Sequence, residues 1–96
     1  MENIEEVKKD VLKSINYARN KAEDFLKRDI NCNNFVQLTN VLSSTEEARS
    51  MTLILKRLFP EDTSIEYLIK EAHSVYGIGY KGKERFAMEC QCKNRK

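Results

Sequence analysis

The chain has 96 residues, the length of one small domain, so we predict a single folding unit over residues 1–96. Hydrophobic residues make up 41% of it and charged residues 33%, with three glycines and one proline, which excludes collagen-like, low-complexity and disordered proteins. The 17 basic and 15 acidic side chains leave a formal net charge of +2, which by itself favours no class of partner.

The N-terminal segment and the hydropathy predict a soluble, cytoplasmic protein that does not bind membranes. Residues 1–6 are acidic and lack the basic and apolar regions of a signal peptide. No apolar run approaches the length of about 18 residues that spans a bilayer. The three cysteines are an odd number, which argues against a disulfide framework, so we expect reduced thiols.

The first segment has apolar residues at helical spacing and predicts a helix over about residues 3–28. Such a helix is roughly 37 Å long at 1.5 Å per residue. Because this length exceeds the width of a small domain, the helix must bend, protrude or pack against another chain. We favour packing against another chain, and we predict a homodimer.

Three further helices are predicted over about residues 34–42, 45–59 and 63–75. Asparagine-rich residues 29–34 favour a turn before them, and the sequence leaves open whether 34–42 is a separate helix. Ser44–Glu47 has the pattern of a capping box at a helix start, and Pro60 is expected to end the helix that follows.

From Tyr76 onward the apolar residues alternate with other residues at a period of two. This pattern predicts strands over about 75–80 and 85–93, joined at a basic turn into a β-hairpin. We therefore predict an α+β fold, with helices first and a C-terminal hairpin. The composition of Glu84–Glu89 also tolerates a helix, so the sequence leaves open whether 85–93 is strand or helix.

The predicted hairpin is the main candidate binding surface. Residues 77–96 contain six basic and two acidic side chains, and an exposed strand edge can pair with a partner. The expected partner-binding residues are Tyr76, Tyr80, Lys81, Lys83 and Arg85.

The segment Gly77–Gly82 matches G-x-G-x-x-G. The dinucleotide-binding form of this motif needs a preceding strand, a following helix and an acidic residue about 20 positions later, none of which is expected here. We therefore assign the glycines to a helix exit, strand flexure and the hairpin turn.

Residues 74–80, Ser-Val-Tyr-Gly-Ile-Gly-Tyr, resemble the strand that enters the wing of response-regulator-type winged-helix domains. The resemblance implies a DNA-binding regulator that uses segment 45–92. In that family the second helix of the pair enters the major groove and the wing contacts the DNA backbone or minor groove. The resemblance would place Tyr67, Lys70 and Ser74 on the first of these surfaces, and the basic turn on the second.

A third hypothesis is a protein that sequesters a nucleotide signal. Tyr17, Arg19 and Lys21 place an aromatic ring beside basic groups, which could stack on a base and hold a phosphate. Cys32, His73, Cys90 and Cys92 could formally supply four zinc ligands, but their spacing matches no known zinc motif. We predict no metal, no cofactor and no catalytic residue.

Taken together, these patterns predict a small non-catalytic protein that binds and occludes a macromolecule, most simply another protein. The richness in Lys, Glu, Asn and Ile is typical of AT-rich bacteria and their phages. From that composition we predict an inhibitor or regulator of phage or mobile-element type, with an anti-defence protein as its narrowest form.

Overall fold

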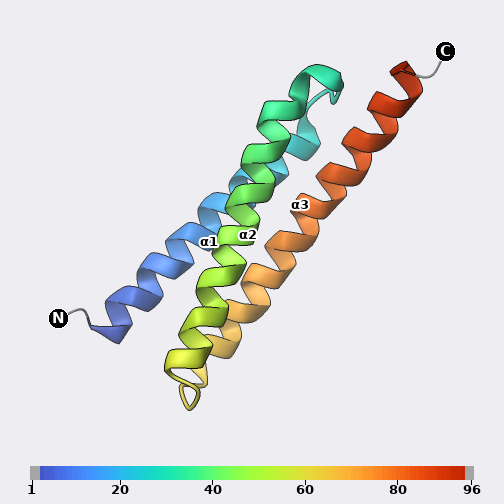
Figure 1. Ribbon diagram of the computed structural model, residues 1–96. Coiled ribbons are helices and arrows are strands. Elements are labelled where there is room, and N and C mark those ends of the chain that lie inside the picture. Colours follow the sequence, from blue (N-terminus) through green and yellow to red (C-terminus); the bar gives the residue numbers. More distant parts are fainter. Residues whose placement is uncertain (1–2, 95–96) are drawn as a thin grey trace.

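The computed structural model describes the backbone of residues 3–94 and the side chains of residues 3–89. Three α-helices make up most of this range: α1 (Ile4–Lys27), α2 (Phe35–Leu58) and α3 (Ser64–Asn94), with a short 3-10 helix, η1 (Cys32–Asn34), before α2. The helices lie side by side, and each runs opposite to the one before it (Figure 1). They form an elongated bundle with extents of 56 × 18 × 17 Å.

A seven-residue repeat of buried positions holds the three helices together. The buried positions follow one another at alternating spacings of three and four residues, which puts them on one side of each helix, as in a coiled coil. They are Val11, Ile15, Ala18, Ala22 and Phe25 in α1, Leu38, Val41, Thr45, Ala48, Thr52 and Leu55 in α2, and Ile65, Leu68, Ala72, Val75, Gly79 and Gly82 in α3.

Small residues in α3 let the helices approach closely in the middle of the bundle. A Cβ atom added at Gly79 would lie 3.1 Å from Cγ2 and Oγ1 of Thr45, and one added at Gly82 would lie 3.0 Å from Cδ2 of Phe25. Thr45 is fully buried, and its hydroxyl donates a hydrogen bond to the Leu42 carbonyl of its own helix at 3.0 Å. The Thr45–Gly79 contact lies between two separate clusters of buried apolar side chains.

The prediction of an α+β fold with a C-terminal hairpin is wrong. Residues 75–80 and 85–93 belong to α3, and residues 3–94 contain no strand. The alternation arises because two successive core positions of α3 are Gly79 and Gly82, which have no side chain to continue the helical apolar pattern. No glycine of the described range has a positive φ, so none is needed for a turn.

The helices predicted over about 34–42 and 45–59 are a single helix, α2. Ser44–Glu47 does not cap a helix, because it lies in the middle of α2 with Thr45 in the core. The helix predicted over 63–75 is the first part of the 31-residue α3. The predicted first helix, about 3–28, corresponds to α1, which begins after an Asn3 cap that accepts a hydrogen bond from the Glu5 amide.

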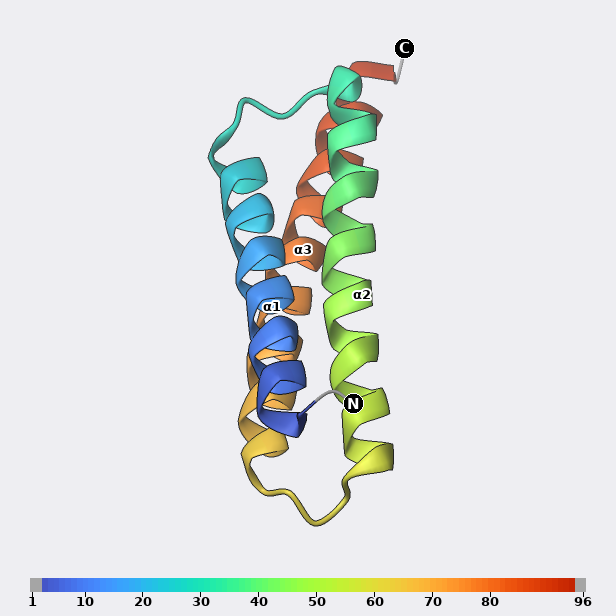
Figure 2. The same cartoon turned by 90° about the vertical axis from the view of Figure 1, so that its left-hand side faces the viewer.

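The connection between α1 and α2 is fixed by one apolar and two amide side chains. Ile30 is 4% exposed and belongs to the cluster that contains Phe25. The Asn31 side chain accepts a hydrogen bond from the Asn33 amide at 2.8 Å, and the Asn34 side chain accepts one from the Asn31 amide at 2.8 Å. This short linker reverses the chain at one end of the bundle (Figure 2).

A charged cluster ties the start of α3 to α1 at the other end of the bundle. Asp62 accepts hydrogen bonds from the Ser64 hydroxyl at 2.6 Å, the Ser64 amide at 3.0 Å and the Lys8 ammonium at 2.9 Å. The bonds from Ser64 and then Lys8 lower the pKa of Asp62 to about 2, below its ordinary value of 3.8. The bonds to Asp62 and Glu5 raise the pKa of Lys8 above its ordinary 10.5.

Two of the three glycines provide a test of close packing in α3. Gly77 has no atom within 4 Å of an added Cβ, so Gly77→Ala is expected to raise the free energy of unfolding by about 0.5–1 kcal/mol through helix propensity alone. Gly82→Ala gains the same propensity but displaces the Phe25 ring, and we expect a net loss of about 1 kcal/mol. Urea denaturation followed by circular dichroism measures both free energies of unfolding. If the two substitutions changed this free energy in the same direction, the close packing at Gly82 would be contradicted.

The Asp62 cluster predicts a pH-dependent contribution to stability. The pKa of Asp62 is lower in the folded chain than in the unfolded chain. The ionised carboxylate therefore contributes to the free energy of unfolding above pH 3.8, and this contribution is lost as the pH falls through about 2. We expect Asp62→Asn to destabilise the bundle at neutral pH, with the difference from the wild type closing toward pH 2. Asp29→Asn, at an exposed position, is the control and should show no such closing in the same denaturation series.

Candidate functional site

The helical geometry of α3 divides the five predicted partner-binding residues between two sides of the bundle. Tyr76, Tyr80 and Lys83 are spaced four and three residues apart and line one shallow hollow of about 160 Å³ between α2 and α3. Arg85 lies on the side next to α1, where its guanidinium donates a hydrogen bond to the Leu26 carbonyl at 2.6 Å. Lys81 is exposed.

The aromatic rings in the α2–α3 hollow are already paired with cations of the same chain. The Arg49 guanidinium lies 4.8 Å from the centre of the Tyr76 ring, and the Lys83 ammonium lies 5.6 Å from that of Tyr80. Arg49 also forms an ion pair with Glu46 at 3.4 Å. These contacts order the outer edge of the α2–α3 interface.

The residues predicted as ligand contacts do not converge on one site. Tyr17 is 58% exposed, and the Lys21 ammonium lies 5.0 Å from its ring centre. Arg19 points the other way, where it forms an ion pair with Glu71 of α3 at 2.6 Å. Three further predicted contacts, Tyr67, Lys70 and Ser74, are exposed on α3.

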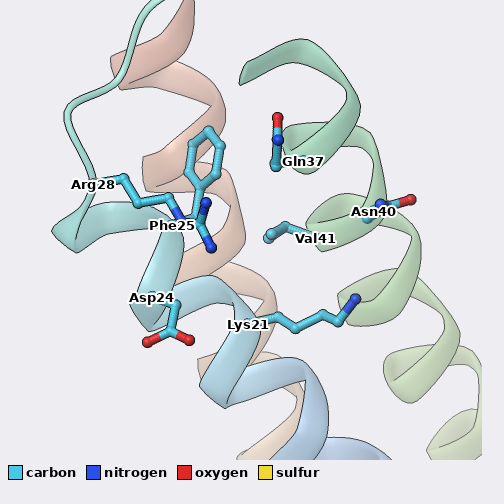
Figure 3. A pocket seen from close by; sticks show the side chains of 7 residues that line it. All are labelled: Lys21, Asp24, Phe25, Arg28, Gln37, Asn40 and Val41. Atoms are coloured by element: carbon cyan, nitrogen blue, oxygen red, sulfur yellow. The ribbon is translucent and has the colours of Figure 1, made fainter. Parts of the chain in front are cut away.

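Lys21 also lines a polar groove of about 210 Å³ between α1 and α2 (Figure 3). Lys21 extends from α1 toward α2, Arg28 lies near Phe25, and Gln37 lies opposite them on α2. Asn40 and Val41 of α2 complete the lining. Asp24 belongs to the same lining and offsets part of the positive charge. The groove is open and mixed in charge, and Phe25 at its base is a core residue.

The structure tests the predictions about the cysteines and the histidine only in part. Cys32 is disulfide-bonded, so the expectation of reduced thiols is wrong for this residue. His73 is exposed on α3. The side chains of Cys90 and Cys92 lie outside the described residues. Among those that are described, no three His, Cys, Asp or Glu side chains lie close enough to hold a metal ion.

The most unusual surface of the bundle was not predicted, and it lies on α2. Leu53, Ile54 and Leu58 are 48%, 58% and 65% exposed, and Phe59, just after the helix, is 40% exposed. Ile54 and Leu58 are four residues apart and therefore neighbours on the helix surface. Leu53 lies on the other side of Ile54, also facing outward. We call Leu53, Ile54 and Leu58 the α2 outer patch; Phe59 continues the spacing of the buried repeat and is not part of it. Adjoining exposed apolar side chains of this size are typical of interaction surfaces.

Helix α2 as a whole is poor in charge, although its charged residues all lie from Glu46 onward, in the part that also carries the patch. Only five of its 24 residues are charged, namely Glu46, Glu47, Arg49, Lys56 and Arg57. Helix α1, of equal length, carries eleven: Glu5, Glu6, Lys8, Lys9, Asp10, Lys13, Arg19, Lys21, Glu23, Asp24 and Lys27. A solvated helix face is normally charged, whereas the centre of a protein interface is depleted of charge. This difference in the number of charged residues is the signal in the sequence that could have identified α2 as the helix with the candidate surface.

Known proteins offer no likeness from which to assign this surface. The chain matches no protein-family model, no curated protein and no solved structure. Within residues 3–94, no helix combines the length and apolar character needed to cross a bilayer.

Two leucines of the same helix test whether the outer patch is needed for folding. Leu55 is 4% exposed and Leu58 is 65% exposed. In dilute solution we expect Leu55→Ala to lower the free energy of unfolding by about 2–5 kcal/mol and Leu58→Ala to change it by about 0.5 kcal/mol or less. Chemical denaturation measures both, and a cost for Leu58→Ala close to that for Leu55→Ala would show that the patch is part of the fold.

Proposed function

We propose that this protein is a protein-binding module whose interface is the outward face of α2, centred on the α2 outer patch. The observation that carries the proposal is the exposure of Leu53, Ile54 and Leu58 on the helix with the fewest charges. Burying these side chains against a partner would remove apolar surface from water.

The charges around the patch favour a protein over a nucleic acid or a lipid surface. Nucleic-acid affinity depends on clustered Lys and Arg side chains that contact phosphates, and helices that lie on membranes carry Lys and Arg on their polar face. On the outward face of α2, Arg57 is offset by Glu46 and Glu47. Binding of DNA by a wing is not proposed, because the segment of the expected wing is helical.

The narrower predictions from the sequence remain part of this proposal. We propose that the module is non-catalytic and cytoplasmic, and that it acts by occluding a surface of its partner. An inhibitor or regulator of phage or mobile-element type remains a hypothesis based on composition, and nucleotide sequestration remains an alternative. The surface described above favours the protein partner.

Site-specific photo-cross-linking in the cells that naturally contain the protein tests the interface. A benzoylphenylalanine side chain would replace either Ile54, in the patch, or Tyr67, on the side of α3 that lies next to α1; both positions are 58% exposed. We expect a discrete adduct with a protein from position 54 and none from position 67. Adding Leu58→Asp should abolish the adduct.

Two results would overturn the proposal. One is the absence of any protein adduct from position 54. The other is an equal yield from positions 54 and 67, which would show that the partner has no preference for the patch over another exposed position. The mass of the adduct gives the partner's size, which bears on the inference below.

A further inference from the structure

We infer that the partner of the α2 outer patch is a second copy of this chain, packed antiparallel along α2. This inference rests on the proposed function and names the occupant of the same surface. It is argued from the order of charged, small and apolar residues along the outermost ridge of α2.

The outermost ridge of α2 consists of Glu47, Ser50, Ile54 and Arg57. These residues are spaced three, four and three positions apart, so they lie in one line on the side opposite the buried repeat. Glu47, Ile54 and Arg57 are exposed, and Ser50 is partly exposed. The ridge therefore begins with an acid, ends with a base and has a small and a large side chain between them.

This order is complementary to itself when it is reversed. In an antiparallel pair whose twofold axis passes level with Thr52, Glu47 of each copy lies opposite Arg57 of the other, and Ile54 lies opposite the small Ser50. Two ion pairs about 15 Å apart along the helix then flank a pair of apolar side chains, each facing a small residue. A parallel pair would instead place Glu47 against Glu47 and Arg57 against Arg57.

The two charged residues of the ridge are available for this pairing. Glu47 and Arg57 take part in none of the ion pairs found within the described part of the chain, whereas Glu46 pairs with Arg49 and Lys56 pairs with Glu66. Leu53 and Leu58 lie on either side of the ridge and would extend the apolar contact. The expected homodimer is thus retained, but its contact surface is on α2 and not on α1.

Sedimentation equilibrium of the purified full chain tests the inference. We expect a monomer–dimer equilibrium that Ile54→Asp weakens at least about tenfold, because this side chain lies at the centre of the contact. Glu47→Arg and Arg57→Glu should each weaken the dimer by about tenfold, since each replaces two attractive contacts with two repulsive ones.

Mixing the two charge-reversed variants is the decisive measurement. In a heterodimer of Glu47→Arg with Arg57→Glu, the first chain places two bases opposite the two acids of the second. The mixture should therefore dimerise about as well as the wild type although neither variant does so alone. Glu23→Arg and Lys70→Glu make the same charge changes at exposed positions on α1 and α3, and they should leave the equilibrium unchanged.

Three results would overturn this inference. The wild type could stay monomeric at every protein concentration, the dimer could be unaffected by Ile54→Asp, or the mixture of the two charge-reversed variants could fail to dimerise. A monomeric wild type together with a cross-link from position 54 to a different protein would leave the proposed function standing. The absence of any protein cross-link from position 54 would reject the proposed function itself.

Discussion

Each helix of this bundle depends on the burial of its seven-residue repeat against the other two. Most of the stability of a helix in a folded protein comes from tertiary packing of its apolar side and not from intrinsic helix propensity. Here that side consists largely of alanine, threonine and glycine at the middle of the bundle, with larger side chains such as Ile15 and Phe25 on either side. Small side chains bring the helix backbones together, and the larger ones fill the space that the small ones leave.

The same constraint explains why α2 differs from its neighbours on the outside. Once the repeat assigns Leu55 to the core, the adjacent Ile54 and Leu53 must point outward. Their exposure contributes nothing to the packing of the three helices. A chain that keeps large apolar side chains on one outward face has a surface suited to an interface, and this is the physical basis of the proposed function.

Part of this architecture could be predicted from the sequence, and the rest was hidden by the residue types in the core. Helix α1 could be predicted because Val11, Ile15 and Phe25 show the repeat with apolar side chains. The continuity of α3 could not, because glycine occupies two core positions and leaves only the flanking tyrosines visible. Likewise, Thr45 in the core of α2 lies within a sequence that imitates a helix start.

The candidate surface was hidden for a related reason. Leu53, Ile54 and Leu55 are three apolar residues in succession, and composition alone cannot say which of them is buried. Only the position of the repeat in α2 decides this, and the two buried threonines obscure that position in the sequence. The predicted binding residues were chosen for a turn that does not exist, so the helix distributes them over two sides of the bundle.

The contact between Gly82 and Phe25 also bears on the register of the bundle. A seven-residue repeat built mainly from small residues permits several alignments, because sliding one helix by seven residues again places core positions opposite one another. A Cβ atom at the position facing Phe25 would lie 3.0 Å from its ring, so the ring would have to shift to accommodate one. Seven residues from Gly82 in the two directions lie Val75 and Glu89, whose larger side chains would require a larger shift. One glycine thus favours the observed alignment of α3 over those displaced by one repeat.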